Sequence, residues 1–152
     1  PAGSTVNDLI QKCGGILDGH KFKAYLPGGA SGGILPSAKG DVPLDFGGEL
    51  TEYGCFVGSH AIVILSDKDN LADVALNLIS FFKHESCGQC TPCRNGTEKI
   101  INIIKNNSKW DKDLLSDISE VMANASICGL GQAASNPILS VLKFFPKDVG
   151  IK

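Results

Sequence analysis

The sequence predicts an α+β protein built from two small modules, a strand-rich one over residues 1–66 and a helical one over residues 67–152. Thirteen of the 18 glycines lie in residues 1–58, which indicates turns and short strands there. Beyond that segment the apolar residues recur at helical spacing. With 152 residues, 43% of them hydrophobic, the chain can form the core of one domain or of two small ones.

The first module is expected to start with a short helix. Its apolar residues recur at helical spacing, Thr5 stands at the N-cap position and Gly14 follows as the stop signal. Strands are expected over residues 22–26, over residues 43–46 as a brief edge strand, and over residues 61–65 as a fully buried one. One helix among several short strands is typical of a small α+β roll such as the β-grasp. The apolar stripe of the helix consists of Val6, Leu9, Ile10 and Cys13.

The second module is expected to be a small antiparallel bundle of four helices joined by short connections. Apolar stripes predict these helices over residues 71–82, 92–104, 112–122 and 137–145. Proline opens the second and the fourth, at the first helical position where it is favoured. The expected N-caps are Thr91, Asp111 and Asn136. The third helix is expected to turn Leu114, Leu115, Ile118, Val121 and Met122 toward the core.

Cysteine spacing gives the strongest chemical signal in the chain. Cys87, Cys90 and Cys93 are separated by two residues each, and Cys128 follows 35 residues after the third. Cysteines this close together are poorly placed to form disulfides with one another, so reduced thiols held for a metal fit better. Four thiolates satisfy a 4Fe–4S cluster, which takes one cysteine per iron. The sequence therefore predicts an iron–sulfur site made of a tight three-cysteine loop and one distant cysteine.

Zinc is the alternative metal for the same four cysteines, because four thiolates also satisfy tetrahedral Zn²⁺. In that case the chain would be a zinc-stabilised interaction module without a redox role. Zinc modules usually bring two separated C-x-x-C pairs, so the observed spacing favours the iron–sulfur cluster over zinc. A third interpretation makes the first module a binder of small molecules, but the sequence shows no convergent polar residues that favour it.

Other residues near the cysteines have possible supporting roles. Gly88 allows backbone N–H groups to approach the sulfur atoms, and Gly129 and Gly131 keep the backbone beside Cys128 close and flexible. Arg94 directly follows the third cysteine, where it either offsets the negative charge of a cluster or faces water. The remaining two cysteines, Cys13 and Cys55, are interpreted as structural, small buried hydrophobic residues.

Charge and composition exclude several classes of protein. A formal net charge of −2 and an isoelectric point of about 5.9 leave no nucleic-acid footprint and no polybasic membrane patch. The longest unbroken apolar run, residues 61–65, is far too short to span a bilayer, so no direct membrane insertion is expected. With no secretory signal pattern, we expect a cytoplasmic location. No general acid–base pair is evident in the sequence, so no catalytic residue is expected. The start at Pro1 suggests that the chain is a piece cut from a longer protein.

One segment carries a specific resemblance to a known family. The string from Glu85 to Thr97, E-S-C-G-Q-C-T-P-C-R-N-G-T, resembles the C-terminal part of the NADH-binding flavoprotein subunit of respiratory complex I and its relatives. Those relatives are the diaphorase subunits of NAD-linked hydrogenases and the beta subunits of NAD-dependent formate dehydrogenases. The segment from Ser126 to Pro137 looks more similar to the hydrogenase and formate dehydrogenase branch, and the resemblance covers nearly the whole chain.

The resemblance implies an electron-transfer role. It implies that Cys87, Cys90, Cys93 and Cys128 bind a 4Fe–4S cluster, that the first module is a soluble-ligand-binding β-grasp domain, and that the second is the cluster-bearing helical bundle. In the family this cluster exchanges electrons with FMN, which exchanges hydride with NAD, and with clusters of partner iron–sulfur subunits. The Rossmann-like domain that holds FMN and NADH has a glycine-rich signature that these residues lack. The missing domain is therefore an expected partner, and we do not expect this chain alone to oxidise NADH.

Overall fold

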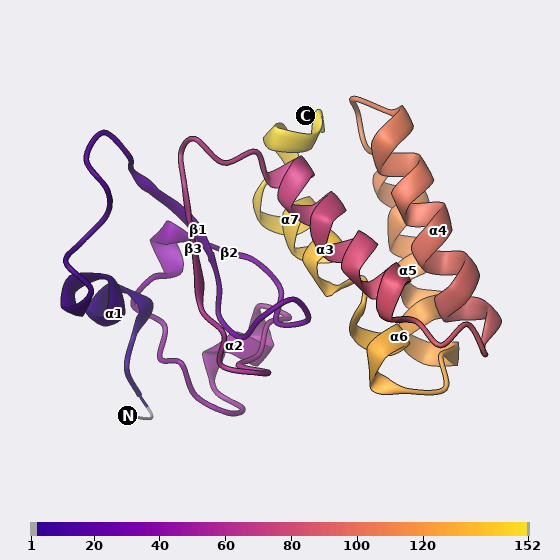
Figure 1. Ribbon diagram of the computed structural model, residues 1–152, viewed down its shortest axis with the longest axis horizontal. Helices are drawn as coiled ribbons and strands as arrows, with labels where there is room; N and C mark the ends of the chain where they lie inside the picture. The colour runs from indigo at the N-terminus through magenta and orange to yellow at the C-terminus, as the bar shows by residue number, and fades with distance from the viewer. Residues whose placement is uncertain (1–2, 152) are drawn as a thin grey trace. The chain divides into compact units, whose positions relative to one another are not determined.

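The computed structural model describes residues 3–151, and the chain divides into two compact units, Pro1–Asp69 and Asn70–Lys152. The first unit contains a small sheet with short helices, and the second is helical (Figure 1). Together they confirm the α+β class. The division falls three residues after the boundary that the sequence predicts.

The first unit is built around a three-stranded antiparallel sheet, in which β1 (Phe22–Leu26) lies between β2 (Leu35–Pro36) and β3 (Val63–Ser66). The strand expected over residues 22–26 is present with those bounds. The edge strand expected over residues 43–46 is absent from the described residues, which have only an isolated bridge between Thr5 and Pro43 there. The elements of this unit are α1 (Val6–Lys12), β1 (Phe22–Leu26), β2 (Leu35–Pro36), the 3-10 helix η1 (Ser37–Lys39), α2 (Glu49–Glu52) and β3 (Val63–Ser66).

Helix α1 starts as predicted but is shorter than its apolar stripe. Thr5 forms a capping box with Asp8: the Asp8 N–H donates to Thr5 Oγ1 over 3.1 Å, and the Thr5 N–H donates to Asp8 Oδ2 over 2.9 Å. The helix ends at Lys12, so Cys13 is its C-cap and is exposed. The interpretation of Cys13 as a buried residue is therefore wrong, whereas Cys55 is buried.

Strand β3 differs from the fully buried strand that the sequence predicts. Val63 is 44% exposed, and Ile64 is exposed as well, so that prediction is wrong. Among the described residues β3 pairs only with β1, so it lies at an edge of the sheet. An apolar run can therefore mark a strand without marking burial, because burial depends on neighbouring elements that the run does not specify.

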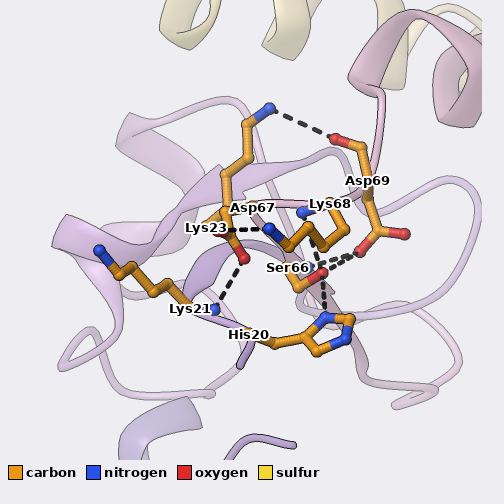
Figure 2. A network of polar contacts seen from close by, with 7 residues as sticks. All are labelled: His20, Lys21, Lys23, Ser66, Asp67, Lys68 and Asp69. Atoms are coloured by element: carbon orange, nitrogen blue, oxygen red, sulfur yellow. Dashed lines mark hydrogen bonds and ion pairs between the residues drawn. The ribbon is translucent and has the colours of Figure 1, made fainter. Parts of the chain in front are cut away.

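A network of polar contacts fastens the end of β3 to the start of β1, as Figure 2 shows. The Lys21 N–H donates to Asp67 Oδ1 over 2.8 Å, and the Ser66 N–H donates to Asp69 Oδ2 over 2.6 Å. These N–H groups hold the pKa of the Asp67 and Asp69 carboxyls below the usual range. The network thus fixes the turn that ends the first unit.

The second unit contains five α-helices among the described residues, one more than the predicted four. Helix α4 (Thr91–Asn106) packs against both α3 (Leu71–Glu85) and α5 (Lys112–Ala125), and α7 (Asn136–Phe144) also packs against α3 and α5 (Figure 1). The additional helix, α6, occupies a segment for which the sequence predicts a loop. The elements are α3 (Leu71–Glu85), α4 (Thr91–Asn106), α5 (Lys112–Ala125), α6 (Gly129–Ala133), α7 (Asn136–Phe144) and the 3-10 helix η2 (Pro146–Val149).

The helix starts follow the capping signals in part. Asp111 caps α5 as predicted, because its Oδ1 accepts a hydrogen bond from the Leu114 N–H over 3.1 Å. Helix α4 begins one residue early, which makes Cys90 its N-cap in place of Thr91. The N-cap of α7 is Ser135, the residue before the predicted one.

The buried face of α5 is narrower than its apolar stripe. Leu115, Ser119 and Met122 are buried, at the three- and four-residue spacing of one helix face. Leu114 and Val121 each stand one residue before that face and are exposed, so their predicted inward orientation is wrong. Within residues 3–151, no helix combines the length and the hydropathy that a membrane crossing requires.

Candidate metal centre

All four cysteines predicted to bind the metal lie in the second unit, at or near the beginnings of two helices. Cys87 lies in the loop between α3 and α4, Cys90 is the N-cap of α4, and Cys93 lies in its first turn. Cys128 is the N-cap of α6. Helix starts leave backbone N–H groups without intrahelical partners, and these groups are suited to negatively charged sulfur.

The beginnings of α4 and α6 are in direct contact. A Cβ atom added at Gly131 in α6 would lie 2.8 Å from the Cβ of Cys93 and 2.6 Å from the Oγ of Ser126. Both distances are too short for real carbon contacts, so only glycine allows this approach. Figure 1 shows α6 at the end of the bundle where α4 begins. The fold thus brings together two cysteine segments that are far apart in sequence.

Cys90 has the clearest electrostatic signature of the four. The Ile127 N–H, and after it the Cys93 N–H, hold the pKa of the Cys90 thiol below its usual range, against the opposing effect of burial. The Ser126 hydroxyl lowers this pKa further, although it does not reach hydrogen-bonding geometry. Because the thiolate is the form of cysteine that binds metals, this environment prepares Cys90 to act as a ligand.

Arg94 braces the cysteine loop. Its Nη1 donates to the carbonyl oxygen of Gly88 over 2.5 Å, and its Nη2 lies 3.4 Å from the Oγ1 of Thr91. Gly88 has a φ of +73°, a conformation that favours glycine, so the loop itself requires this residue. At Gly129 an added Cβ would meet nothing within 4 Å, and packing does not require glycine there.

The accessibility of the four cysteines differs. Cys93 is buried and Cys90 is half-buried, whereas Cys87 and Cys128 are exposed. A group bound by all four would therefore rest on the bundle and be open on one side. Ile127, which is 76% exposed, lies at the same open edge next to Cys128 in the sequence.

Zinc and a 4Fe–4S cluster place different demands on four cysteine sulfurs. In the described part of the chain, no three His, Cys, Asp or Glu side chains come close enough together to hold one metal ion. A zinc–sulfur bond of about 2.3 Å requires ligand sulfurs about 3.8 Å apart, whereas a cluster with one iron per cysteine takes more widely spaced thiolates. The Ser126 hydroxyl is buried between the cysteine segments and has no hydrogen-bond partner among residues 3–151, which suits a bound group that carries acceptor sulfurs.

Comparison with known families agrees with this chemistry. Residues 73–151, just over half of the chain, match the NADH-ubiquinone oxidoreductase-F iron-sulfur binding region. The chain belongs to this family. Its metal cofactor is accordingly a 4Fe–4S cluster, and the resemblance based on the cysteine motif is confirmed.

Relatives of this iron–sulfur binding family extend the match over nearly all of the chain. The F subunit of NADH-quinone oxidoreductase in Mycobacterium bovis is 37% identical over 150 residues, which is 95% of this chain and 34% of the relative. The NADP-reducing hydrogenase subunit HndC of Solidesulfovibrio fructosivorans is 35% identical over 154 residues, 97% of this chain and 31% of the relative. The chain therefore spans about a third of the length of these curated relatives. Their similar identities do not separate the complex I branch from the hydrogenase branch.

A solved structure agrees with the fold of this family member. The crystal structure of an NAD⁺-reducing [NiFe]-hydrogenase in the H2-reduced state superimposes with a TM-score of 0.82 at 25% identity. The match covers 98% of this chain and 26% of that chain.

Sequence reasoning missed three residues that shape the site. Ser86, Ser126 and the backbone of Ile127 contact the cysteine segments. Each stands within two residues of a predicted ligand, so proximity to the cysteines was the available signal. Gly131 was indicated by the sequence as a glycine beside Cys128, but its contact with Cys93 of a distant helix was not.

Proposed function

We propose that Cys87, Cys90, Cys93 and Cys128 bind the 4Fe–4S cluster and that the chain is the electron-relay part of an NAD-linked oxidoreductase. The observation that carries this proposal is the contact between the beginnings of α4 and α6, which unites the two cysteine segments. When bound, the cluster supplies acceptance and release of single electrons.

The residues of the chain contribute charge stabilisation and partial exclusion of water. The N–H groups of Ile127 and Cys93 stabilise negative charge on the Cys90 sulfur. The buried side of the site rests on the bundle, whereas its open edge contains Cys87, Ile127 and Cys128. We place the exchange of electrons with neighbouring redox groups at this open edge.

The rest of the longer protein supplies the other cofactors in this proposal. FMN and NAD bind outside this chain, in a preceding domain, and further iron–sulfur subunits exchange electrons with the cluster. The names of the hydrogenase relatives, which give NADP and NAD⁺ as the molecules reduced, support a nicotinamide partner reaction. The chain alone would not oxidise NADH, and a cytoplasmic location suits this role.

The proposal includes the roles of the two modules. Residues 1–66 are the β-grasp module of the soluble-ligand-binding type, supported by the small antiparallel sheet and the preceding helix. Residues 67–152 are the cluster-bearing bundle, in which the four longer helices form the bundle and α6 carries the fourth cysteine.

Metal and sulfide analysis tests the proposal directly. The 152-residue chain, purified without oxygen, is assayed for iron, acid-labile sulfide and zinc, and its visible absorption spectrum is recorded. About four irons and four sulfides per chain are expected. One zinc without sulfide, retained after anaerobic reconstitution with iron and sulfide, would contradict the electron-relay function and support the zinc-stabilised module.

A further inference from the structure

Ser86 places a hydroxyl against one of the cysteine sulfurs. Its Oγ lies 3.3 Å from the Sγ of Cys93 and accepts a hydrogen bond from the Gly88 N–H over 3.2 Å. Either atom can be the donor while Cys93 is a thiol, but a thiolate that binds metal has no proton to give. In the metal-bound state the Ser86 hydroxyl is therefore the donor toward Cys93.

Ser126 places a second hydroxyl in the same region. The residue is 5% exposed, and its Oγ has no hydrogen-bond partner in the described part of the chain. Its backbone is nevertheless held firmly: the N–H donates to the Met122 carbonyl over 3.2 Å, and the carbonyl accepts from Gln132 Nε2 over 3.1 Å. A fixed, buried and unpaired donor is costly unless a bound group completes it.

The position of the Ser126 hydroxyl oxygen follows from its approach to Gly131. The position of a Cβ at Gly131 is 2.6 Å from Ser126 Oγ and 2.8 Å from Cys93 Cβ, so the hydroxyl lies in the space between the two cysteine segments. Gly131 carries no side chain that would separate them. Two hydroxyl groups, at the ends of α3 and α5, thus lie beside the cysteine segments that would hold a cluster.

We propose that Ser86 and Ser126 donate hydrogen bonds to the sulfur atoms of the bound cluster and thereby raise its reduction potential. This inference rests on the proposed function. One-electron reduction adds negative charge to the iron and sulfur atoms, and hydrogen-bond donors stabilise the more negative state. Both serines are positioning residues that set the potential without themselves gaining or losing a proton.

Redox titration of reconstituted protein tests this inference. The 152-residue chain and its variants are reconstituted anaerobically with ferrous iron and sulfide, and the reduced cluster is quantified by electron paramagnetic resonance at a series of applied potentials. Ser86→Ala and Ser126→Ala are each expected to lower the midpoint potential. A tenfold change in the equilibrium between the oxidised and the reduced cluster corresponds to a change of about 59 mV in the midpoint potential. Ser86→Thr keeps the hydroxyl and is expected to retain the original potential.

Ser119→Ala is the matched control. Ser119 is also a buried serine of the second unit, but its hydroxyl donates to the Leu115 carbonyl of its own helix over 2.7 Å. Its replacement should leave the potential unchanged. Unchanged potentials in both test variants at full iron content, or an equal shift in the control, would overturn the inference.

A second readout uses the metal-free chain. Removing an unpaired buried hydroxyl should leave thermal stability equal or higher, so Ser126→Ala should not lower the melting temperature without metal. A clear loss of stability in the metal-free variant would show that the hydroxyl serves the fold and would contradict the proposed role.

Failure of the wild-type chain to bind iron and sulfide would refute the electron-relay function itself, whereas unchanged potentials would refute only the role of the serines.

Discussion

Replacement of Gly131 by alanine tests the contact that brings the two cysteine segments together. The added methyl carbon would lie 2.6 Å from Ser126 Oγ, 2.7 Å from Ser126 Cβ and 2.8 Å from Cys93 Cβ. Two of these neighbours are Cβ atoms fixed to the backbone, so α6 must move away from α4. Overpacking of this kind costs about 1–3 kcal/mol, and the gain in helix propensity from glycine to alanine returns up to about 1 kcal/mol.

With a propensity gain of about 1 kcal/mol subtracted, the net loss of stability is up to about 2 kcal/mol. In a unit of this size each 1 kcal/mol of that loss lowers the melting temperature by about 4–8 °C. Circular dichroism at 222 nm follows the helices of the second unit, first without metal. Iron retention after anaerobic reconstitution is then expected to fall as well, because the displaced helix carries Cys128.

Gly129→Ala provides the control within the same helix. An added Cβ there meets nothing within 4 Å, so only the gain in helix propensity remains, and stability should be unchanged or slightly higher. If the two alanine variants have the same stability and the same iron content, close packing at Gly131 does not join the cysteine segments, and our reasoning about the site is refuted.

Three further predictions concern the ligands, the first unit and the core. Cys128→Ala should lose or degrade the cluster while Cys13→Ala, at an exposed position in the other unit, should not; equal iron content in both variants would contradict the ligand assignment. The lowered pKa of Asp69 means that its carboxylate stabilises the fold above the unfolded value of 3.8, and that this contribution disappears as the pH falls through the lower folded value. The free energies of unfolding of wild type and Asp69→Asn, measured in urea, should therefore differ at pH 7 and converge as the pH falls below 3.8. A difference that grows in acid would contradict the direction of this pH dependence. Leu115→Ala should lower the free energy of unfolding in denaturant by about 2–5 kcal/mol. Leu114→Ala, at a side chain 38% exposed, should lower it much less, and equal losses of stability would contradict the assigned core face of α5.

Local signals in the sequence predicted much of the fold. Thr5 and Asp111 mark helix starts because a short polar side chain satisfies N–H groups within its own turn, and this interaction needs no other part of the chain. The strand over residues 22–26 was also predicted from local signals. The short helix α6 was not predicted, because its five residues include two glycines and its N-cap is a cysteine. It therefore has neither the composition nor the length of a typical helix.

Orientation of side chains was predicted less well than secondary structure. Leu114 and Val121 are apolar and lie near the buried face of α5, yet they are exposed. An apolar stripe limits the possible faces of a helix, but the neighbouring helices determine which part of it is covered. The same holds for Cys13 and for β3, whose exposure depends on where α1 ends and on which strands pair.

The class of chemistry can be read from the amino-acid sequence alone, because the two-residue spacing of Cys87, Cys90 and Cys93 places three potential metal ligands in one short loop. How the fourth cysteine joins them depends on the packing of the folded chain. Cys128 stands 35 residues away in the sequence, and its approach depends on the packing of α6 against α4 through a position without a side chain. Spacing along a chain limits local geometry, whereas contacts between distant helices arise only from the packing of the whole bundle, and these contacts also place the hydroxyls of Ser86 and Ser126 at the site.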